Sequence, residues 1–176
     1  MKGISIWLFS KIVMLVFLII TFSTVLGFMK LSKDRISADS AEALAMQIKD
    51  AILTTLHTNT LSSQAVVPIP KTLPESFGNV EEARLKTYTV KINSTTPDPT
   101  TGEQVIYVAI GWGENPSAYA AASSFYTSNV DITNPGASLS FFSNYSFFVV
   151  EKTTGTKKTL GFKACPTSDL SQGCVT

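Results

Sequence analysis

An apolar run near the amino terminus constrains this chain more than any other feature. Residues 12–29 include no charged residue and no proline, and residues 4–9 before them are almost wholly apolar. At a rise of about 1.5 Å per residue, a helix over residues 12–29 spans roughly 27 Å, close to the hydrocarbon thickness of a bilayer. Because a soluble domain does not leave such a cylinder in water, this segment must lie in lipid, be cleaved off or pack against copies of itself.

Two interpretations of the run stay open: an anchor or assembly helix, and a cleaved secretory signal. A signal has a basic start, an apolar stretch of about 7–15 residues and small residues at its cleavage site. Lys2 supplies a basic start, but the apolar stretch is longer than this, and residues 29–33 make a poor cleavage site. We therefore favour the anchor or assembly helix.

The segment that follows is also predicted to be helical. Residues 32–57 contain no glycine and no proline. Apolar and small residues recur there at three- and four-residue spacing, which is typical of a helix with one buried stripe. This stripe comprises Ala41, Leu44, Ile48, Ala51, Ile52 and Thr55. We expect one helix from about Ile4 to His57, apolar all round in its first half and amphipathic in its second, and we assign residues 1–58 to it.

The fold class predicted for the whole chain is α+β, a long hydrophobic helix followed by an antiparallel β-sheet head. Residues 59–80 contain three prolines and are expected to form an extended connector outside any sheet interior, with Val66, Val67, Ile69 and Leu73 inward. Residues 81–176 are expected to form the head. Its predicted strands are residues 85–93, 104–112, 138–152 and 157–164, while residues 119–126 fit either a short helix or a strand.

Composition and motifs point away from catalysis. The formal net charge is +1 and 15 % of the residues are charged, which suggests no nucleic acid partner. The only histidine, His57, lies at the end of the predicted helix without a nucleophile or carboxylate nearby in sequence. Neither phosphate-loop pattern is present, and the turn around Asp98 lacks the spacing of a calcium loop. We therefore predict no enzyme activity, no cofactor and no metal site.

Two features near the surface of the head suggest export. Cys165 and Cys174 lie in the last dozen residues, where they either close a small disulfide loop outside the cell or remain free thiols. Asn93 and Asn144 each begin a glycosylation sequon. We expect Asn93 to be the better acceptor, because it precedes a predicted turn.

In architecture the chain resembles a type IV pilin or pilin-like protein, especially of the archaeal kind. The matching features are Lys2-Gly3 directly before the apolar run, a helix of some fifty residues, a β-sheet head and the cysteine pair at the carboxy end. The resemblance implies a processing site at Gly3, where a dedicated peptidase would cut, and a helix that then packs in a filament centre. Leu8 stands where that family usually carries a glutamate.

Four residues of the helix are expected to matter for assembly: Lys11, Phe17, Phe22 and Gly27. Lys11 either extends its stem to the membrane interface or pairs with a carboxylate of a neighbouring chain. Gly27, with Ser23 and Thr24, permits close approach of helices.

Three functions follow from these observations. The first is a subunit of a cell-surface filament, held in the membrane before assembly and joined to its copies through the helix. The second is a membrane-anchored extracellular binding or adhesion module. The third is a low-abundance pseudopilin of a secretion or uptake machine, which differs from the first mainly in copy number.

Overall fold

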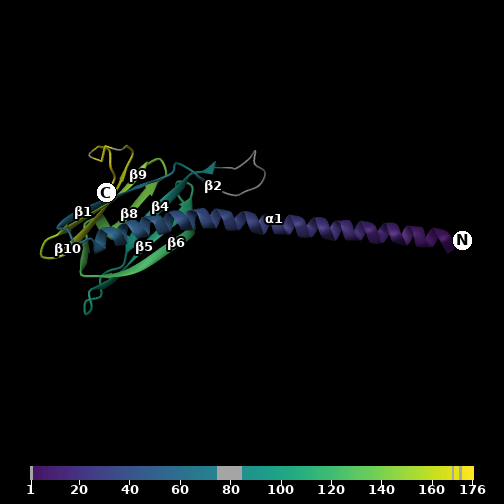
Figure 1. The fold of residues 1–176 in the computed structure, drawn as a ribbon, viewed down its shortest axis with the longest axis horizontal. Helices are drawn as coiled ribbons and strands as arrows, with labels where there is room; N and C mark the ends of the chain where they lie inside the picture. The colour runs from purple at the N-terminus through teal and green to yellow at the C-terminus, as the bar shows by residue number, and fades with distance from the viewer. Residues whose placement is uncertain (1, 75–84, 168, 171) are drawn as a thin grey trace.

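The computed structural model describes residues 2–74, 85–167, 169–170 and 172–176. Figure 1 shows one long helix that projects from a β-rich head, with the carboxy terminus in the head. Helix α1 spans Lys2–His57, 56 residues without interruption, and is about 84 Å long at a rise of about 1.5 Å per residue. These bounds agree with the predicted helix. No proline interrupts them, and Gly3 and Gly27 are the only glycines within α1.

The strands of the head form two four-stranded sheets and one two-stranded sheet. Their orders are β1-β9-β10-β7, β6-β5-β4-β8 and β2-β3. All neighbours are antiparallel except β7 and β10, which are parallel. The bounds are β1 Ser62–Pro68, β2 Leu73–Pro74, β3 Leu85–Lys86, β4 Tyr88–Ser94, β5 Glu103–Trp112, β6 Tyr119–Ser128, β7 Val130–Ile132, β8 Ser138–Phe142, β9 Phe147–Thr154 and β10 Lys158–Cys165, with a short 3₁₀ turn at Pro135–Ala137.

One hydrophobic core lies between the two larger sheets. Phe141 of β8 and Phe148 of β9 stack across it with ring centroids 6.0 Å apart, and Phe148 stacks in turn on Phe162 of β10 at 6.1 Å. Helix α1 packs against β1 and β6, an edge strand from each sheet. The predicted stripe of α1 faces this core, since Ala41, Leu44, Ile48 and Ile52 are all buried. Residues 41–56 of the helix are thus part of the head.

The prediction of one strand over residues 138–152 is wrong. The chain turns at residues 143–146, so β8 and β9 belong to different sheets. The amide of Ser143 donates to the carbonyl of Tyr88 at 2.8 Å, and that of Ser146 to the carbonyl of Cys165 at 3.0 Å. These bonds anchor the turn to β4 on one side and to β10 on the other. Aromatic residues on both sides of the turn concealed it in the sequence.

The connector prediction also needs correction. Residues 62–68 form β1, which pairs with β9 along its whole length, so this part belongs to the head. The prolines are compatible with pairing because β1 is an edge strand. Val67, Ile69 and Leu73 are buried as expected, but Val66 is 45 % exposed because neighbouring residues of a strand point to opposite faces. The predicted connector residues 75–80 lie outside the described part of the chain.

Residues 119–126, for which both a short helix and a strand were open, lie in the strand β6, which pairs with β5.

The turn between β4 and β5 is held by Asp98, whose carboxylate accepts from the amides of Thr100 and Thr101 at 2.7 and 3.0 Å. Hydrogen bonds from Thr101 and then Thr100 lower the pKa of Asp98. This carboxylate therefore stabilises a surface turn.

Candidate assembly surface on the helix

The amino-terminal half of α1 exposes apolar side chains on every side. Each described side chain from residue 9 to residue 29 is exposed, and Phe17 and Phe22 are each 68 % accessible. Figure 1 shows this half standing clear of the head. A large exposed apolar surface marks an interaction site with a protein or a membrane. The same helix thus has residues 41–56 in a core, while the described side chains of residues 9–29 are exposed in this single chain.

The apolar half is long enough to cross a bilayer. The segment Phe9–Met29 has 21 residues and lies near the amino terminus, and at about 1.5 Å per residue it is about 32 Å long. Within the described residues, it is the one helical segment that passes this test of length and composition. A signal sequence at the same place passes the test as well. Length alone therefore indicates either an anchor or a signal.

Hydroxyl groups inside this segment bond to their own helix. Thr21 Oγ1 donates to the carbonyl of Phe17 at 2.8 Å, and Thr24 Oγ1 to that of Ile20 at 2.6 Å. A hydroxyl that bonds four residues back does not need water. The segment can therefore enter lipid or a helix bundle without leaving either threonine unsatisfied.

Gly27 has no role in packing within the single chain. A Cβ placed there would have no heavy atom within 4 Å beyond its neighbours and the local backbone. Glycine inside a helix costs about 0.5–1 kcal/mol relative to alanine. Ser23 lies four residues earlier on the same face, which gives the spacing of small residues at which two helices approach closely. Because Gly27 has no side chain, it leaves a shallow depression on the exposed surface of the helix.

Lys11 lies two residues inside the amino end of the Phe9–Met29 segment, and it is exposed. Near the end of a span, a lysine stem reaches the interface while its ammonium stays hydrated. Gly3, the predicted processing site, lies in the first turn of α1.

The other predicted sites lie on the head. Cys165 and Cys174 form a disulfide. Asn93 is exposed and is the second-last residue of β4, where it pairs with Tyr107 of β5 and Ser138 of β8, and the predicted turn begins two residues later. Asn144 is exposed in the turn between β8 and β9. Since sequons are expected on surface loops, Asn144 is the better placed of the two.

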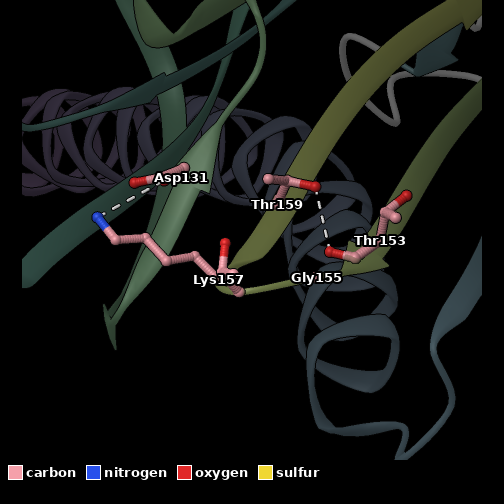
Figure 2. Close-up of a pocket in the computed structure, with 6 residues that line it drawn as sticks. Asp131, Thr153, Gly155, Lys157 and Thr159 are labelled. Carbon is pink, nitrogen blue, oxygen red and sulfur yellow. Dashed lines mark hydrogen bonds and ion pairs between the residues drawn. The ribbon is translucent and has the colours of Figure 1, made fainter.

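An open hollow beside the β9–β10 turn is lined by polar side chains (Figure 2). Its lining residues are Asp131, Thr153, Gly155, Thr156, Lys157 and Thr159. Lys157 Nζ lies 3.8 Å from Asp131 Oδ2, and both side chains are mostly exposed. Thr159 Oγ1 donates to the carbonyl of Thr153 at 3.1 Å. Such an exposed ion pair contributes little to stability, and these lining residues do not place a nucleophile against a base.

Sequence reasoning missed Lys152, which is 2 % exposed. Its Nζ donates to the carbonyl of Thr58, directly after α1 ends at His57. Lys152 shares the core-facing side of β9 with Phe148 and Val150. Alternation along β9 is the signal that identifies it, once the strand is known to begin at Phe147. By contrast, His57 is exposed at the helix end.

Comparison of the chain with protein-family models, curated proteins and solved structures found no match.

Proposed function

We propose that this protein is a structural subunit of an extracellular filament of the type IV pilus kind, assembled through the amino-terminal half of α1. The observation that carries the proposal is the division of one continuous helix. Residues 41–56 supply the head core, whereas residues 9–29 expose apolar side chains all round. A helix that is hydrophobic on every side requires a fully apolar environment.

Packing of copies of the helix against one another supplies that environment. Burial of apolar surface stabilises by roughly 25 cal/mol per Å². A bundle of such helices therefore removes, for each copy, the large free-energy cost of exposing this apolar surface to water. In a membrane, before assembly, lipid covers the same surface and the threonine hydroxyls remain satisfied by their own helix. The head then faces solvent, where its disulfide loop is suited to an oxidising environment.

The resemblance to pilins supports the same conclusion from sequence. Lys2-Gly3 directly precedes the apolar run, as it does at the processing site of that family. The net charge of +1 offers no reason to invoke nucleic acid as a partner. The partners proposed are therefore other copies of this chain, and the membrane that holds the helix before assembly.

Electron microscopy of material detached from the cell surface tests this function. Filaments should be present, and mass spectrometry should find this chain in them with its amino terminus at Ile4. Filaments in which the chain begins at Met1 would show assembly without the cut. If the chain is found only in the detergent-extracted membrane fraction, the filament function is wrong.

A second function is favoured by the length of the Phe9–Met29 segment, about 32 Å at a rise of about 1.5 Å per residue. A helix of this length suits a lone anchor that holds an extracellular binding or adhesion module. This function predicts a monomer that stays in the membrane. A pseudopilin would instead be recovered at a few copies per machine.

A further inference from the structure

The outer edge of β10 in the sheet β1-β9-β10-β7 is closed to further strands. Beside β10, β7 pairs with Lys158–Leu160. The side-chain amide of Asn134 then bonds the amide and the carbonyl of Phe162, each at 2.7 Å, and Val175 bonds those of Ala164, each at 2.9 Å. At the other edge, β1 ends in Pro68, which has no amide to donate to a further strand. Such devices prevent pairing with foreign strands.

Among the described residues, the sheet β6-β5-β4-β8 has no proline and no side-chain bonds of this kind at its edges, and α1 packs against the core-facing side of β6. Its edge strands have 10 and 5 residues, and neither contains a charged residue, a proline or a glycine. In the described structure, the main chain of β6 bonds only to β5. The main chain of β8 bonds to β4, and Phe142 also accepts from the amide of Tyr145. Both strands leave donors and acceptors along the outer edge, which is a template for another strand.

We propose that β6 of one copy pairs with β8 of the next copy, so that this sheet continues from head to head. The inference rests on the proposed filament, in which all copies of α1 point the same way. Neighbouring strands in the order β6-β5-β4-β8 are antiparallel, so β6 and β8 run in opposite directions. A copy placed alongside in the same orientation therefore presents β8 antiparallel to β6, and the alternation continues.

Other pairings of these edges conflict with the common direction of the helices. Antiparallel pairing of β6 with β6 needs a two-fold axis, which reverses the strand direction of one head relative to the other. The helix that packs along that head is reversed with it (Figure 1). Pairing of β6 with β8 is heterologous, and heterologous contacts repeat into open filaments or rings.

The side chains of β6 and β8 permit close approach of these two strands from neighbouring copies. On the solvent face, β6 presents Ala122, Ser124 and Tyr126, and β8 presents Ser140, all of them exposed and uncharged. No like charges therefore oppose one another across the new ladder. Tyr126 is 77 % exposed in the single chain, and cross-strand neighbours would cover its ring. The five residues of β8 set the length of this ladder.

Cross-linking between single-cysteine variants tests the pairing. Ser124→Cys on β6 and Ser140→Cys on β8 are assembled together into filaments and treated with a short flexible bismaleimide, which tolerates an offset in register. We expect a cross-linked dimer from the mixture and a ladder of oligomers from the double variant. Ser62→Cys on β1, mixed with Ser140→Cys, is the matched control and should give at least tenfold less dimer.

The outcomes separate the pairing from the filament itself. Intact filaments without a link between positions 124 and 140 would overturn the strand pairing and leave the filament function standing. Dimers from Ser124→Cys alone would also overturn it, since they report pairing of β6 with itself. Absence of filaments from unmodified protein would overturn the proposed function and the pairing together.

A charge placed on the edge supplies a second readout. Ser124→Lys should reduce filament yield at least tenfold, because an edge lysine opposes strand addition. The melting temperature of the head in detergent should not change, since Ser124 is exposed in the single chain. Ser62→Lys is the control and should assemble normally. Full filament yield from Ser124→Lys would contradict the pairing.

Discussion

At the scale of single residues, the buried ammonium of Lys152 connects two parts of the fold that are far apart in sequence. It reaches from β9 to the carbonyl of Thr58, one residue beyond α1. Buried charges are costly unless they are hydrogen-bonded. The carboxy end of a helix carries partial negative charge and unpaired carbonyls, so it favours a cation there. Lys152 thus stabilises the end of α1 and fixes it to the head.

Two substitutions of Lys152 separate the contribution of its apolar stem to stability from that of its hydrogen bond to Thr58. Lys152→Ala should lower the free energy of unfolding by about 2–5 kcal/mol, because it removes buried methylenes and leaves the Thr58 carbonyl without its donor. Lys152→Met keeps most of the apolar stem and should cost about half as much. Denaturation of the full chain in mild detergent measures both. Lys157→Met, at an exposed lysine, is the control, and a Lys152→Met protein more stable than the original would contradict this role.

Tyr88 gives the head a dependence on alkaline pH. The side chain is buried, and its hydroxyl donates to the carbonyl of Pro70 at 2.5 Å. Burial raises the pKa of Tyr88 well above its ordinary value. Below a pH of about 10 both the folded and the unfolded states keep the proton, and the full stability is present. Above it the unfolded state loses the proton first, so stability falls by about 1.4 kcal/mol per pH unit from this group.

Tyr88→Phe should therefore change stability differently at the two ends of this range. At pH 7 the variant should be about 1 kcal/mol less stable, because the bond to Pro70 is lost. At pH 11 the difference should shrink or reverse, because phenylalanine has no proton to release on unfolding. Unfolding of both proteins at the two pH values measures this. An equal difference at both would show that Tyr88 does not titrate with unfolding.

At the scale of elements, α1 contributes to the stability of the head through its buried stripe. Ile48 is fully buried, while Met46, two residues before it, is 46 % exposed. Ile48→Ala should destabilise the head by about 2–5 kcal/mol, the usual cost of such a cavity. Met46→Ala should change stability by at most about 0.5 kcal/mol. Denaturation in detergent compares the two, and equal effects would show that α1 does not belong to the core.

The same elements show how far sequence patterns determine the structure. The helix and its stripe could be predicted because Ala41, Leu44 and Ile48 repeat at the helical period. Alternation along the strand predicted over residues 85–93 places Tyr88, Val90 and Ile92 on one face, and all three are buried in the structure. Alternation is a local property, however, and does not report the sheet to which a strand belongs.

The errors have a common physical origin in long-range pairing. If the strand predicted over residues 138–152 were unbroken, alternation from Leu139 and Phe141 would place Phe147 and Val149 on the same apolar face. In the structure Phe148 and Val150 join the main core, and Lys152 follows them. The edge position of β1 was missed because it depends on β9, 87 residues away at the Gln64–Glu151 contact. For the candidate surface, the exposed apolar helix was evident from sequence, but the two open strand edges were not.

At the scale of the whole molecule, Gly27 allows a test in which the single chain is not disturbed. Gly27→Leu meets no atom of the head, and it replaces a poor helix former by a good one. The helix content in detergent should stay equal or rise. Filament yield should fall at least tenfold, because leucine prevents close approach of neighbouring helices.

Electron microscopy and circular dichroism of the same preparations measure assembly and helix content. Ala43→Leu adds similar bulk at an exposed position of α1 beside the head and is the control. Normal filaments from Gly27→Leu would mean that close helix contacts at this position are not required.

The continuity of α1 has a mechanical consequence. A pull on the amino end enters the head along the length of the helix, since no break separates its free half from its buried half. The load is then spread as shear over the side chains between α1 and strands β1 and β6. No hinge concentrates the strain, so the head and its stalk respond to tension as one stiff body. The disulfide loop follows β10 in the chain and lies outside the strands β1 and β6 that receive this load.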